Sequence, residues 1–383
     1  MNYLETKCMK ERLELLPHEI QRYSRHLVLP GFGMENQKKL KNASVLVIGA
    51  GGLGAPLLLY LAAAGVGKIG IVDPDRVDES NLQRQVLYTM EDIGYLKVDA
   101  ARRRLLAMNP LVEVETFPYA LTNENALQIL GNYDVVADGT DNFPTRYLVN
   151  DACVILGKVN VYASIFRFEG QVSVFNYTLP GGERGPNYRN LYPTPPAAGS
   201  IPSCAEGGVL GVLPGIIGSI QANEVIKIIT GIGAPLAGRL FLFDAAAFTT
   251  RVIRIPAQAP VVVDALIDYE VFCDPFAATT IPEIGPNTLK SWIAEGKAFQ
   301  LIDVREPAEF AIGNIGGELI PLASISEDLG RIRQDQPVVF VCHSGQRSAI
   351  ALQKIQGLTG WTHLFNLKGG IKDWPEATTG YTL

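Results

Sequence analysis

A strand, a glycine-rich turn and a helix follow one another without a break near residue 50, and this order limits the possible folds more than any other feature. Val45–Ile48 has the length and apolar character of a buried strand, Gly49–Gly54 reads Gly-Ala-Gly-Gly-Leu-Gly, and residues 55–65 form an apolar run of helical length. Glycines at such a turn let the backbone approach a phosphate, whose charge the helix N-terminus attracts. The pattern predicts a nucleotide-binding unit, although the glycine spacing alone would also suit a tight turn between strand and helix.

Strands and helices continue to alternate after this unit. Such alternation predicts an α/β fold with a Rossmann-like, mostly parallel sheet that carries helices on both faces. The expected strands are Val45–Ile48, Ile69–Asp73, Val112–Thr116, Asp134–Asp138, Val159–Ala163 and Gln171–Phe175, followed by two near residues 240–255. Helices are expected over Pro17–Val28 and Gly208–Thr230. Thr178–Ser203 is rich in Gly and Pro and is expected to be a long loop, of the kind that often covers a substrate.

The composition changes between residues 256 and 286, where Pro, Ala and Thr are frequent. We therefore predict a first domain over residues 1–275, a linker over residues 276–282 and a smaller α/β domain over residues 283–383. The expected elements of the smaller domain are helix Asn287–Glu295, strand Phe299–Asp303, a helix near Ala308, strand Val338–Cys342 and helix Ser348–Gly357.

The overall composition excludes several classes of protein. With 47% hydrophobic and 19% charged residues, the chain of 383 residues has the composition of a folded globular protein. Its net charge of −6 argues against a general nucleic-acid or anionic-membrane binder. No apolar run reaches the roughly 20 residues of a membrane span, and the N-terminus lacks the apolar core of a signal peptide. The five cysteines are widely spaced, which fits reduced thiols and a cytoplasmic location.

Polar and cationic residues follow the second expected strand. That strand ends at Asp73, where a Rossmann-type unit places the acid that holds a ribose hydroxyl. Asn81, Arg84 and Lys97 come next in the sequence. Positive charge near the phosphates favours chemistry on a triphosphate over hydride transfer. Taken one at a time, Arg84 and Lys97 would also fit solvated surface charges, and Asp141 would fit a helix cap.

Several short motifs stand in a fixed order along the first domain. They are Arg22-Tyr-Ser-Arg25, Gly49–Gly54, Asp73, Asn81-Leu-Gln-Arg84-Gln, Lys97 and Thr140-Asp141-Asn142. Over residues 15–275 this set resembles the MoeB/ThiF-type adenylyltransferases, which are relatives of the ubiquitin-activating enzymes. In that family the carboxylate of a small ubiquitin-like sulfur carrier with a Gly-Gly C-terminus attacks the α-phosphate of ATP. Pyrophosphate leaves and an acyl-adenylate remains.

The resemblance implies a role for each motif residue. Two anions meet in such a reaction, so the site needs fixed positive charge. The implied ligands of ATP are Gly49, Gly51, Gly52, Gly54, Asp73 (ribose), Asn81, Arg84 and Lys97 (triphosphate), with Asp141 on Mg²⁺ and Arg25 reaching across a dimer interface into the neighbouring site. ATP, Mg²⁺ and a homodimer are expected on the same ground.

One departure from the family pattern concerns metal. MoeB/ThiF-type enzymes commonly hold a structural zinc with two Cys-x-x-Cys pairs. Here the place of the first pair reads Asn187-Tyr-Arg-Asn190, and Cys273 has no cysteine at that spacing on either side. We therefore expect no structural zinc. The chain resembles the MoeZ-type members, which lack this zinc and carry a C-terminal extension.

The extension contains a cysteine loop, Cys342-His-Ser-Gly-Gln-Arg347, between an apolar strand and an expected helix. Backbone N–H groups, the helix dipole and Arg347 would favour a thiolate there. The Cys-x4-Arg spacing is one residue shorter than the phosphate-enclosing Cys-x5-Arg loop of related phosphatases. With residues 301–310, the loop resembles a rhodanese over residues 283–383, which implies sulfur transfer through a Cys342 persulfide. An inert buried cysteine is the alternative. Asp303 and Arg305 are expected to be structural.

Cys204 stands at the end of the long loop, in Pro-Ser-Cys-Ala-Glu-Gly-Gly, just before an expected helix. Proximity to a helix N-terminus lowers a thiol pKa below its usual value of about 8.5. By resemblance, Cys204 is a second catalytic cysteine that forms a transient bond while the carrier is thiolated. A packing cysteine is the alternative, and Cys8 and Cys153 suggest no chemical role.

The sequence thus predicts a fused adenylyltransferase and sulfurtransferase that converts a carrier's terminal carboxylate into a thiocarboxylate, with a cysteine desulfurase or another persulfide donor as sulfur source. Molybdopterin, thiamine, cysteine and tRNA-thiolation pathways all use carriers of this kind. Two alternatives remain. An NAD-dependent oxidoreductase with an accessory thiol domain leaves Asn81, Arg84 and Lys97 without roles. A non-catalytic carrier-binding scaffold has no reason to keep the cationic cluster together with Cys342.

Overall fold

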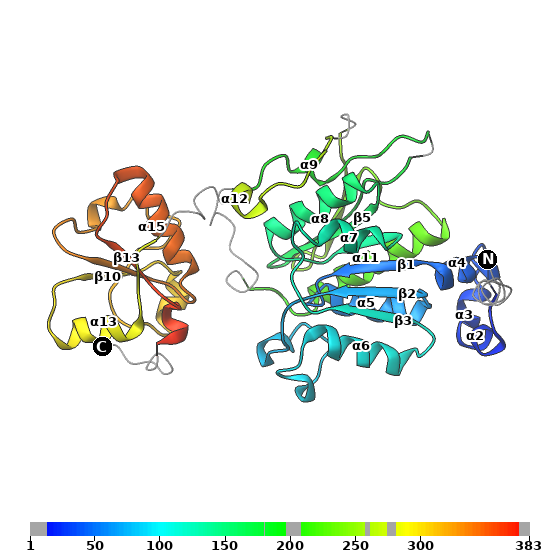
Figure 1. Cartoon of the computed structure of the whole chain (residues 1–383), viewed down its shortest axis with the longest axis horizontal. Helices are drawn as coiled ribbons and strands as arrows, with labels where there is room; N and C mark the ends of the chain where they lie inside the picture. The colour runs from blue at the N-terminus through cyan, green and yellow to red at the C-terminus, as the bar shows by residue number, and fades with distance from the viewer. Residues whose placement is uncertain (1–13, 180, 197–207, 257–260, 274–280, 375–383) are drawn as a thin grey trace. The chain divides into compact units, whose positions relative to one another are not determined.

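The computed structural model describes residues 14–179, 181–196, 208–256, 261–273 and 281–374. Among them, the residues up to Tyr269, apart from Pro196, form one compact unit, and those from Glu270 onward form a second. Figure 1 labels the elements of both units.

The first unit is built on an eight-stranded sheet with strand order β3-β2-β1-β4-β5-β6-β7-β8. Its strands are β1 Ser44–Ile48, β2 Lys68–Val72, β3 Glu113–Phe117, β4 Val135–Asp138, β5 Val159–Phe166, β6 Glu169–Phe175, β7 Arg239–Asp244 and β8 Thr249–Arg254. Neighbours from β3 to β5 are parallel, and neighbours from β5 to β8 are antiparallel. The expected α/β fold with a mostly parallel, Rossmann-like sheet is confirmed.

Helices cover both faces of this sheet. The helical segments of this part of the chain are α2 Pro17–Arg22, α3 Ser24–Leu27, α4 Gly33–Asn42, α5 Gly54–Ala64, η1 Glu79–Asn81, η2 Met90–Asp92, α6 Lys97–Met108, α7 Ala126–Gly131, α8 Phe143–Ile155, α9 Tyr188–Leu191 and α11 Leu213–Thr230, and α12 Tyr269–Cys273 begins at the last residue of the unit. α5 packs between α6 and α11, while α7 and α8 pack together on the opposite side of the sheet (Figure 1). In the part of the chain that the structure describes, no helix combines the length and apolar character of a bilayer span.

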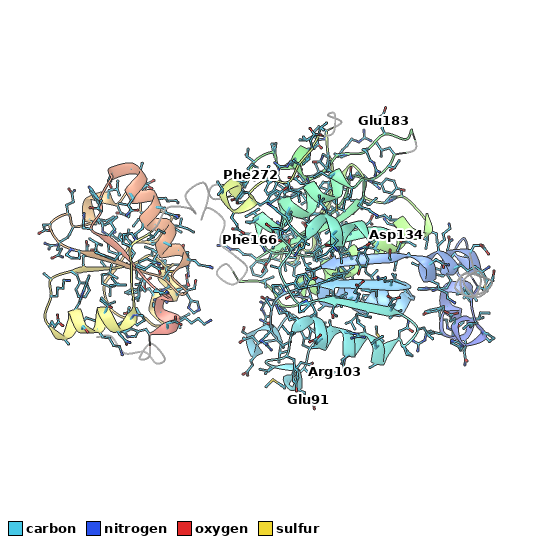
Figure 2. The ribbon with its side chains drawn as sticks, in the orientation of Figure 1. Glu91, Arg103, Asp134, Phe166, Glu183 and Phe272 are labelled. Carbon is cyan, nitrogen blue, oxygen red and sulfur yellow. The ribbon has the colours of Figure 1, made fainter. Side chains whose placement is uncertain are left out.

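The centre and the edge of the sheet differ in burial. Val45, Leu46 and Val47 of β1 are fully buried, because both faces of this strand lie under helices. Strand β8, at one edge, is exposed along its whole length and carries Arg251 and Arg254. Side chains fill the space between the helices and the sheet (Figure 2).

Two expected helices have different limits in the structure. The helix expected over Pro17–Val28 breaks at Tyr23 into α2 and α3. The Tyr23 ring is buried and its hydroxyl accepts a hydrogen bond of 2.9 Å from Asn109 Nδ2, so a tertiary contact overrides the local helical pattern. The helix expected from Gly208 begins only at Leu213, with a proline in its first turn.

The second unit is a five-stranded sheet of order β11-β10-β12-β13-β9 in which all neighbours are parallel. Its elements are β9 Glu283–Ile284, α13 Pro286–Ala294, β10 Gln300–Asp303, α14 Pro307–Ile312, β11 Glu318–Leu319, η3 Leu329–Arg331, β12 Val338–Val341, α15 Gln346–Thr359, β13 Leu364–Leu367 and η4 Gly370–Asp373. β12 lies at the centre, with alternate side chains in the cores on its two faces. The smaller α/β domain is confirmed, and its central strand leads directly to Cys342.

Candidate active sites

The glycine-rich loop lies between the end of β1 and the start of α5. A Cβ atom on Gly54 would lie 2.0 Å from the carbonyl oxygen of Gly49, so this turn closes only without side chains. A Cβ on Gly49 would lie 3.1 Å from the carbonyl oxygen of Gly139, after β4. The loop is therefore tightly wound and touches the end of the neighbouring strand.

Asp73, directly after β2, ties the neighbouring strand end to this loop. Its two carboxylate oxygens accept backbone hydrogen bonds of 2.8 Å from Ala50 and Asp75. Burial raises the pKa of the Asp73 carboxyl, against the opposing effects of the Lys97 charge and of the two backbone donors. A carboxylate has further lone pairs beyond these two bonds, so the predicted ribose contact is compatible with this geometry.

Lys97, the first residue of α6, is the buried cation of the site. Its side chain is 7% exposed, and Nζ donates a 2.7 Å hydrogen bond to Asp75, whose side chain is 64% exposed. Lysine is almost never this buried unless it is paired. Because the partner carboxylate lies at the surface, it can move away, and an incoming anion can take its place beside the ammonium group.

Arg84 and Asn81 lie on the segment that borders the glycine loop. The Arg84 Cγ atom is 3.8 Å from the position that a Cβ on Gly52 would take. Its Nη1 donates a 3.0 Å hydrogen bond to the carbonyl oxygen of Ser80, and Asn81 Oδ1 accepts one of 3.3 Å from the Asp78 backbone. The structure thus brings the glycines, Asp73, Arg84 and Lys97 to one edge of the sheet.

Asp141 follows β4, the parallel neighbour of β1 on the other side. Its side chain is exposed. The cap of helix α8 is the next residue, Asn142, whose side chain accepts a 2.9 Å hydrogen bond from the Thr145 backbone. Asp141 therefore does not serve as the cap, and its carboxylate faces solvent.

Buried polar groups near these strand ends went unassigned in the sequence analysis. Gln85 is 3% exposed, and Asp138 is fully buried. Among the described residues, Gln85 Oε1 and Asp138 Oδ2 have no hydrogen-bond partner. Burial raises the pKa of Asp138. Their positions in the sequence could have pointed to both residues, because Gln85 ends the Asn81–Gln85 motif and Asp138 ends an expected strand.

Arg25 lies on α3 with an exposed side chain. Among the described residues, Arg25 forms no ion pair. The structure contains a single chain, and the expected reach of Arg25 into a neighbouring subunit stays a prediction.

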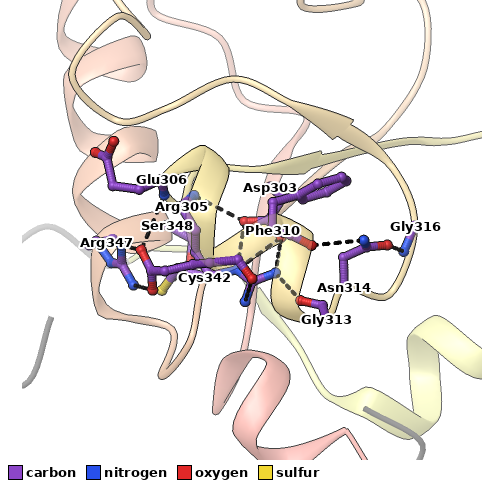
Figure 3. A network of polar contacts seen from close by, with 11 residues as sticks. Asp303, Arg305, Glu306, Phe310, Gly313, Asn314, Gly316, Cys342, Arg347 and Ser348 are labelled. Carbon is purple, nitrogen blue, oxygen red and sulfur yellow. Dashed lines mark hydrogen bonds and ion pairs between the residues drawn. The ribbon is translucent and has the colours of Figure 1, made fainter. Parts of the chain in front are cut away.

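Cys342 directly follows strand β12 and is fully buried. The Gly345 backbone N–H points at its sulfur atom with an N–S distance of 3.1 Å. Ser348 Oγ lies 3.4 Å from the same sulfur, and Figure 3 shows both of these side chains. A Cβ on Gly370 would lie 2.4 Å from the carbonyl oxygen of Cys342, so the η4 segment packs closely on the loop. One backbone donor and one hydroxyl donor thus form a cradle around the sulfur, and the expected favouring of a thiolate stays a prediction.

Arg347 forms a bidentate ion pair with Glu309 of α14, with N–O distances of 2.6 and 2.7 Å. The hydrogen bonds from Arg347 lower the pKa of Glu309. The charge of Arg347 is thus shared with a carboxylate that the sequence analysis did not connect to the loop. Asp303 and Arg305 form a second, buried pair, and Arg305 Nη2 also donates 2.7 Å to the Gly313 carbonyl (Figure 3), which fits the expected structural role.

Hydrogen bonds hold the region where the family pattern places zinc. The Asp151 carboxylate, fully buried on α8, accepts hydrogen bonds of 2.8 and 2.7 Å from Arg189 and one of 2.8 Å from the Tyr269 hydroxyl. Asn187 Nδ2 donates 2.8 Å to the Val261 carbonyl. We call these contacts the polar clip, because they fasten residues 261–269 to α8 and α9.

The other cysteines divide into two groups. Cys204 and Cys8 lie outside the described residues, so their expected roles stay predictions. Cys153 is fully buried in α8, where burial raises its thiol pKa. Cys273 is half-buried at the end of α12.

Known proteins match both units. A sequence model of the ThiF family matches residues 23–262, and a model of the rhodanese-like domain matches residues 285–377. Among solved structures, E. coli MccB with MccA-N7isoASN shares the fold of the first unit, with a TM-score of 0.56 and 22% identity over 64% of this chain and 74% of that chain.

Curated relatives match either the whole chain or its first unit alone. The probable adenylyltransferase/sulfurtransferase MoeZ of Mycobacterium tuberculosis is 50% identical over 94% of this chain and 93% of its own length. The sulfur carrier protein adenylyltransferase of Thermus thermophilus is 55% identical over 67% of this chain and 97% of its own. Adenylyltransferase and sulfurtransferase MOCS3 of Drosophila yakuba is 40% identical over 98% of this chain and 87% of its own length. The chain therefore belongs to the ThiF family, among members that join a ThiF domain to a rhodanese-like domain and act as adenylyltransferase and sulfurtransferase.

Proposed function

We propose that the first unit adenylates the C-terminal glycine carboxylate of a small ubiquitin-like sulfur carrier and that Cys342 then supplies the sulfur of a thiocarboxylate. One observation carries the proposal: a glycine loop with adjacent cations and a donor-lined cysteine loop occur in the same chain. The name of the Thermus relative, a sulfur carrier protein adenylyltransferase, supports the choice of substrate.

The adenylation step brings two anions together, the carrier carboxylate and the α-phosphate. Arg84 and Lys97 supply positive charge beside the glycine loop, and the first N–H groups of α5 face the same edge of the sheet. In this proposal Lys97 exchanges its surface partner Asp75 for a phosphate oxygen, and Asp73 accepts from the ribose hydroxyls. The products are the carrier acyl-adenylate and pyrophosphate.

Magnesium fits the exposed carboxylate of Asp141. Mg²⁺ usually keeps several waters and needs only one or two protein carboxylates beside the substrate phosphates. No cluster of three or more His, Cys, Asp or Glu side chains suited to a metal occurs among the residues that the structure describes. The ion would neutralise charge on the phosphates, and Asp141 would hold it at the end of β4.

The sulfur step follows from the cradle around Cys342. The Cys342 thiolate attacks the terminal sulfur of a donor persulfide, the donor thiolate leaves, and Cys342 carries the persulfide. Its terminal sulfur then attacks the acyl carbon, AMP leaves, and an acyl disulfide links carrier and enzyme. A second thiol, for which the sequence nominates Cys204, attacks the Cys342 sulfur of that disulfide. The carrier thiocarboxylate leaves, and two further thiols reduce the disulfide left between Cys342 and the second thiol, are themselves joined as a disulfide and release Cys342 as a thiolate.

The partners in this proposal are the carrier, a persulfide donor such as a cysteine desulfurase, and a second copy of the chain. The exposed Arg25 would complete the adenylation site of that second copy. A cytoplasmic location fits all three partners, because the proposed cycle requires reduced thiols.

The test is ATP–pyrophosphate exchange with Mg²⁺ and several carriers that end in Gly-Gly. We expect exchange that requires a carrier and disappears in Asp141→Ala. Binding of NAD in preference to ATP, with no exchange for any carrier, would favour the oxidoreductase instead. Exchange that persists without a carrier would contradict the proposed substrate.

A further inference from the structure

One hydroxyl group in the cysteine loop faces three acceptors. Ser348 is fully buried on the first turn of α15. Its Oγ lies 2.7 Å from Asn366 Oδ1, 3.2 Å from the Gly345 carbonyl oxygen and 3.4 Å from the Cys342 sulfur. A serine hydroxyl has a single proton to donate, so these groups compete for it.

Asn366 is held in the orientation that makes it an acceptor. It is 3% exposed on β13, and its Nδ2 donates a 3.2 Å hydrogen bond to Glu283 Oε1 on β9. Because that bond occupies the amide nitrogen, the amide oxygen is directed at Ser348. Three strands thus contribute to one network, with Cys342 at the end of β12, Asn366 on β13 and Glu283 on β9.

The preferred acceptor depends on the charge of the sulfur. A hydrogen bond to an ionised acceptor is roughly twice as strong as one between neutral groups. While Cys342 is a neutral thiol, the short contact to Asn366 is the better one. When Cys342 becomes a thiolate, the sulfur becomes the stronger acceptor, and the hydroxyl needs only to rotate about its C–O bond.

We propose that Ser348 is a positioning residue that switches its single proton between Asn366 and Cys342, and that Asn366 is the acceptor that competes with the sulfur. The inference rests on the proposed sulfur transfer, in which the Cys342 thiolate occurs twice. It is the nucleophile toward the donor persulfide, and it is the leaving group when reduction opens the disulfide between Cys342 and the second thiol. The switch stabilises the thiolate at these two stages without holding a permanent charge in the loop.

Replacement of Ser348 leaves the other charges around the loop in place, whereas replacement of Asn366 also removes a hydrogen bond to Glu283. The ionisable residues of the loop and of the elements packed on it include His343, Arg347, Lys354 on α15, Glu306 and Glu309 at α14, Asp303 at the end of β10, Arg305 after it, Glu283 on β9, and Lys368, Lys372 and Asp373 around η4. Arg347 and Arg305 are each paired with a carboxylate. A change in the pH at which the Cys342 thiol ionises therefore reports the loss of the Ser348 hydroxyl or of the Asn366 acceptor that competes for it.

The two sides of the switch predict opposite effects. Ser348→Ala removes the donor, so the thiolate forms at higher pH. Asn366→Leu removes the competing acceptor, so the hydroxyl is free for the sulfur and the thiolate forms at lower pH. A purely structural role would shift both variants in the same direction, because both disturb the packing under the loop.

The experiment is the pH profile of alkylation of Cys342 by iodoacetamide in the full-length protein, followed by mass spectrometry of the peptide that contains Cys342. We expect the midpoint of the alkylation profile to rise by about one to two pH units in Ser348→Ala, because the loss of a hydrogen bond to a charged group shifts a pKa by about this amount. Ser348→Thr should return it close to the original midpoint, and Asn366→Leu should lower it. Ser324→Ala, which removes a hydroxyl bonded to the Pro321 carbonyl in the same unit, should leave it unchanged.

An unchanged midpoint in Ser348→Ala, or shifts of the same sign in Ser348→Ala and Asn366→Leu, overturns the switch. If Ser348→Ala does not fold, as judged by circular dichroism, the sign of the Asn366→Leu shift decides alone. Incubation with glutathione persulfide separates this result from the proposed function. Opposite shifts without persulfide formation on Cys342 would sustain the switch and contradict the sulfur transfer.

Discussion

At the scale of single residues, both sites depend on charges whose partners lie far away in the sequence. Lys97 pairs with Asp75 at the mouth of the nucleotide loop, and Arg347 pairs with Glu309. The sequence identified Lys97 and Arg347 by their place in motifs. It did not identify Glu309, Ser348 or Asn366, because only the fold brings α14, α15 and β13 around Cys342.

Replacement of Lys97 tests whether the buried ammonium group acts on the phosphates. We expect Lys97→Ala to slow ATP–pyrophosphate exchange by a factor on the order of 10²–10³, as for the loss of one electrostatic contact in an active site. Lys68→Ala is a matched control, since Lys68 also forms a 2.7 Å ion pair, with Glu115, but at the opposite end of β2. If the exchange rate fell equally in the two variants, the role of Lys97 would be to stabilise the fold.

The pair between Arg347 and Glu309 makes the second unit sensitive to acid. Arg347 lowers the pKa of Glu309 from its ordinary 4.5, so the pair stabilises the fold above that value and the contribution disappears as the pH falls through the lowered pKa. We expect the melting temperature to fall more steeply between about pH 5 and pH 3 in the original protein than in Glu309→Gln.

Tryptophan fluorescence is the measurement for this pair, because all three tryptophans, Trp292, Trp361 and Trp374, lie in the second unit. At neutral pH, Glu309→Gln should melt at a lower temperature than the original protein. Glu295→Gln, at the exposed end of α13, should match the original at every pH. Parallel melting curves for Glu309→Gln and the original protein across the acid range would contradict the expectation.

At the scale of elements, the polar clip joins α8, α9 and α12 through one buried carboxylate. Arg189 and the Tyr269 hydroxyl both donate to Asp151. Burial, followed by the negative charge of Asp151, raises the pKa of the Tyr269 hydroxyl, so this group stays a donor at physiological pH. The clip lies in the region where the sequence departs from the zinc pattern.

Loss of the arginine should weaken the clip more than loss of the tyrosine hydroxyl. Removal of one partner from a buried ion pair costs about 3–5 kcal/mol, whereas a hydrogen bond to a charged group contributes about 1.5–3 kcal/mol. In calorimetry, the first unit should therefore melt at a lower temperature in Arg189→Ala than in Tyr269→Phe. Arg251→Ala, on exposed β8, should match the original. A chelator that lowers this transition would instead indicate a metal and contradict the expected absence of zinc.

The sequence predicted elements best where the local pattern and the fold agree. The apolar strands of the central sheet and the helix after the glycine loop were expected nearly at their observed limits, because a strand buried on both faces needs a continuous apolar run. The break at Tyr23 was missed, since it depends on Asn109. Strands β9 and β11 have two residues each, which is too short for any periodicity to appear.

At the scale of the whole molecule, the chain joins two chemical steps that should be separable by mutation. We expect Cys342→Ser to keep carrier-dependent pyrophosphate exchange and to lose thiocarboxylate formation. Asp141→Ala should show the converse pattern, with no exchange but normal persulfide loading of Cys342. Mass spectrometry of the carrier and of the Cys342 peptide measures both outcomes. Loss of exchange in Cys342→Ser would show that the two steps are not independent.

The exposed strand β8 has a consequence for the behaviour of the protein in concentrated solution. An open edge offers unpaired backbone groups to strands of other chains, and charged side chains hinder such pairing. Arg251 and Arg254 provide that hindrance. At ordinary ionic strength, salt largely screens the repulsion between exposed charges that lie more than about 8–10 Å apart. The colloidal stability of the protein should therefore decline as salt is added. Arginine-free variants of this edge should precipitate first.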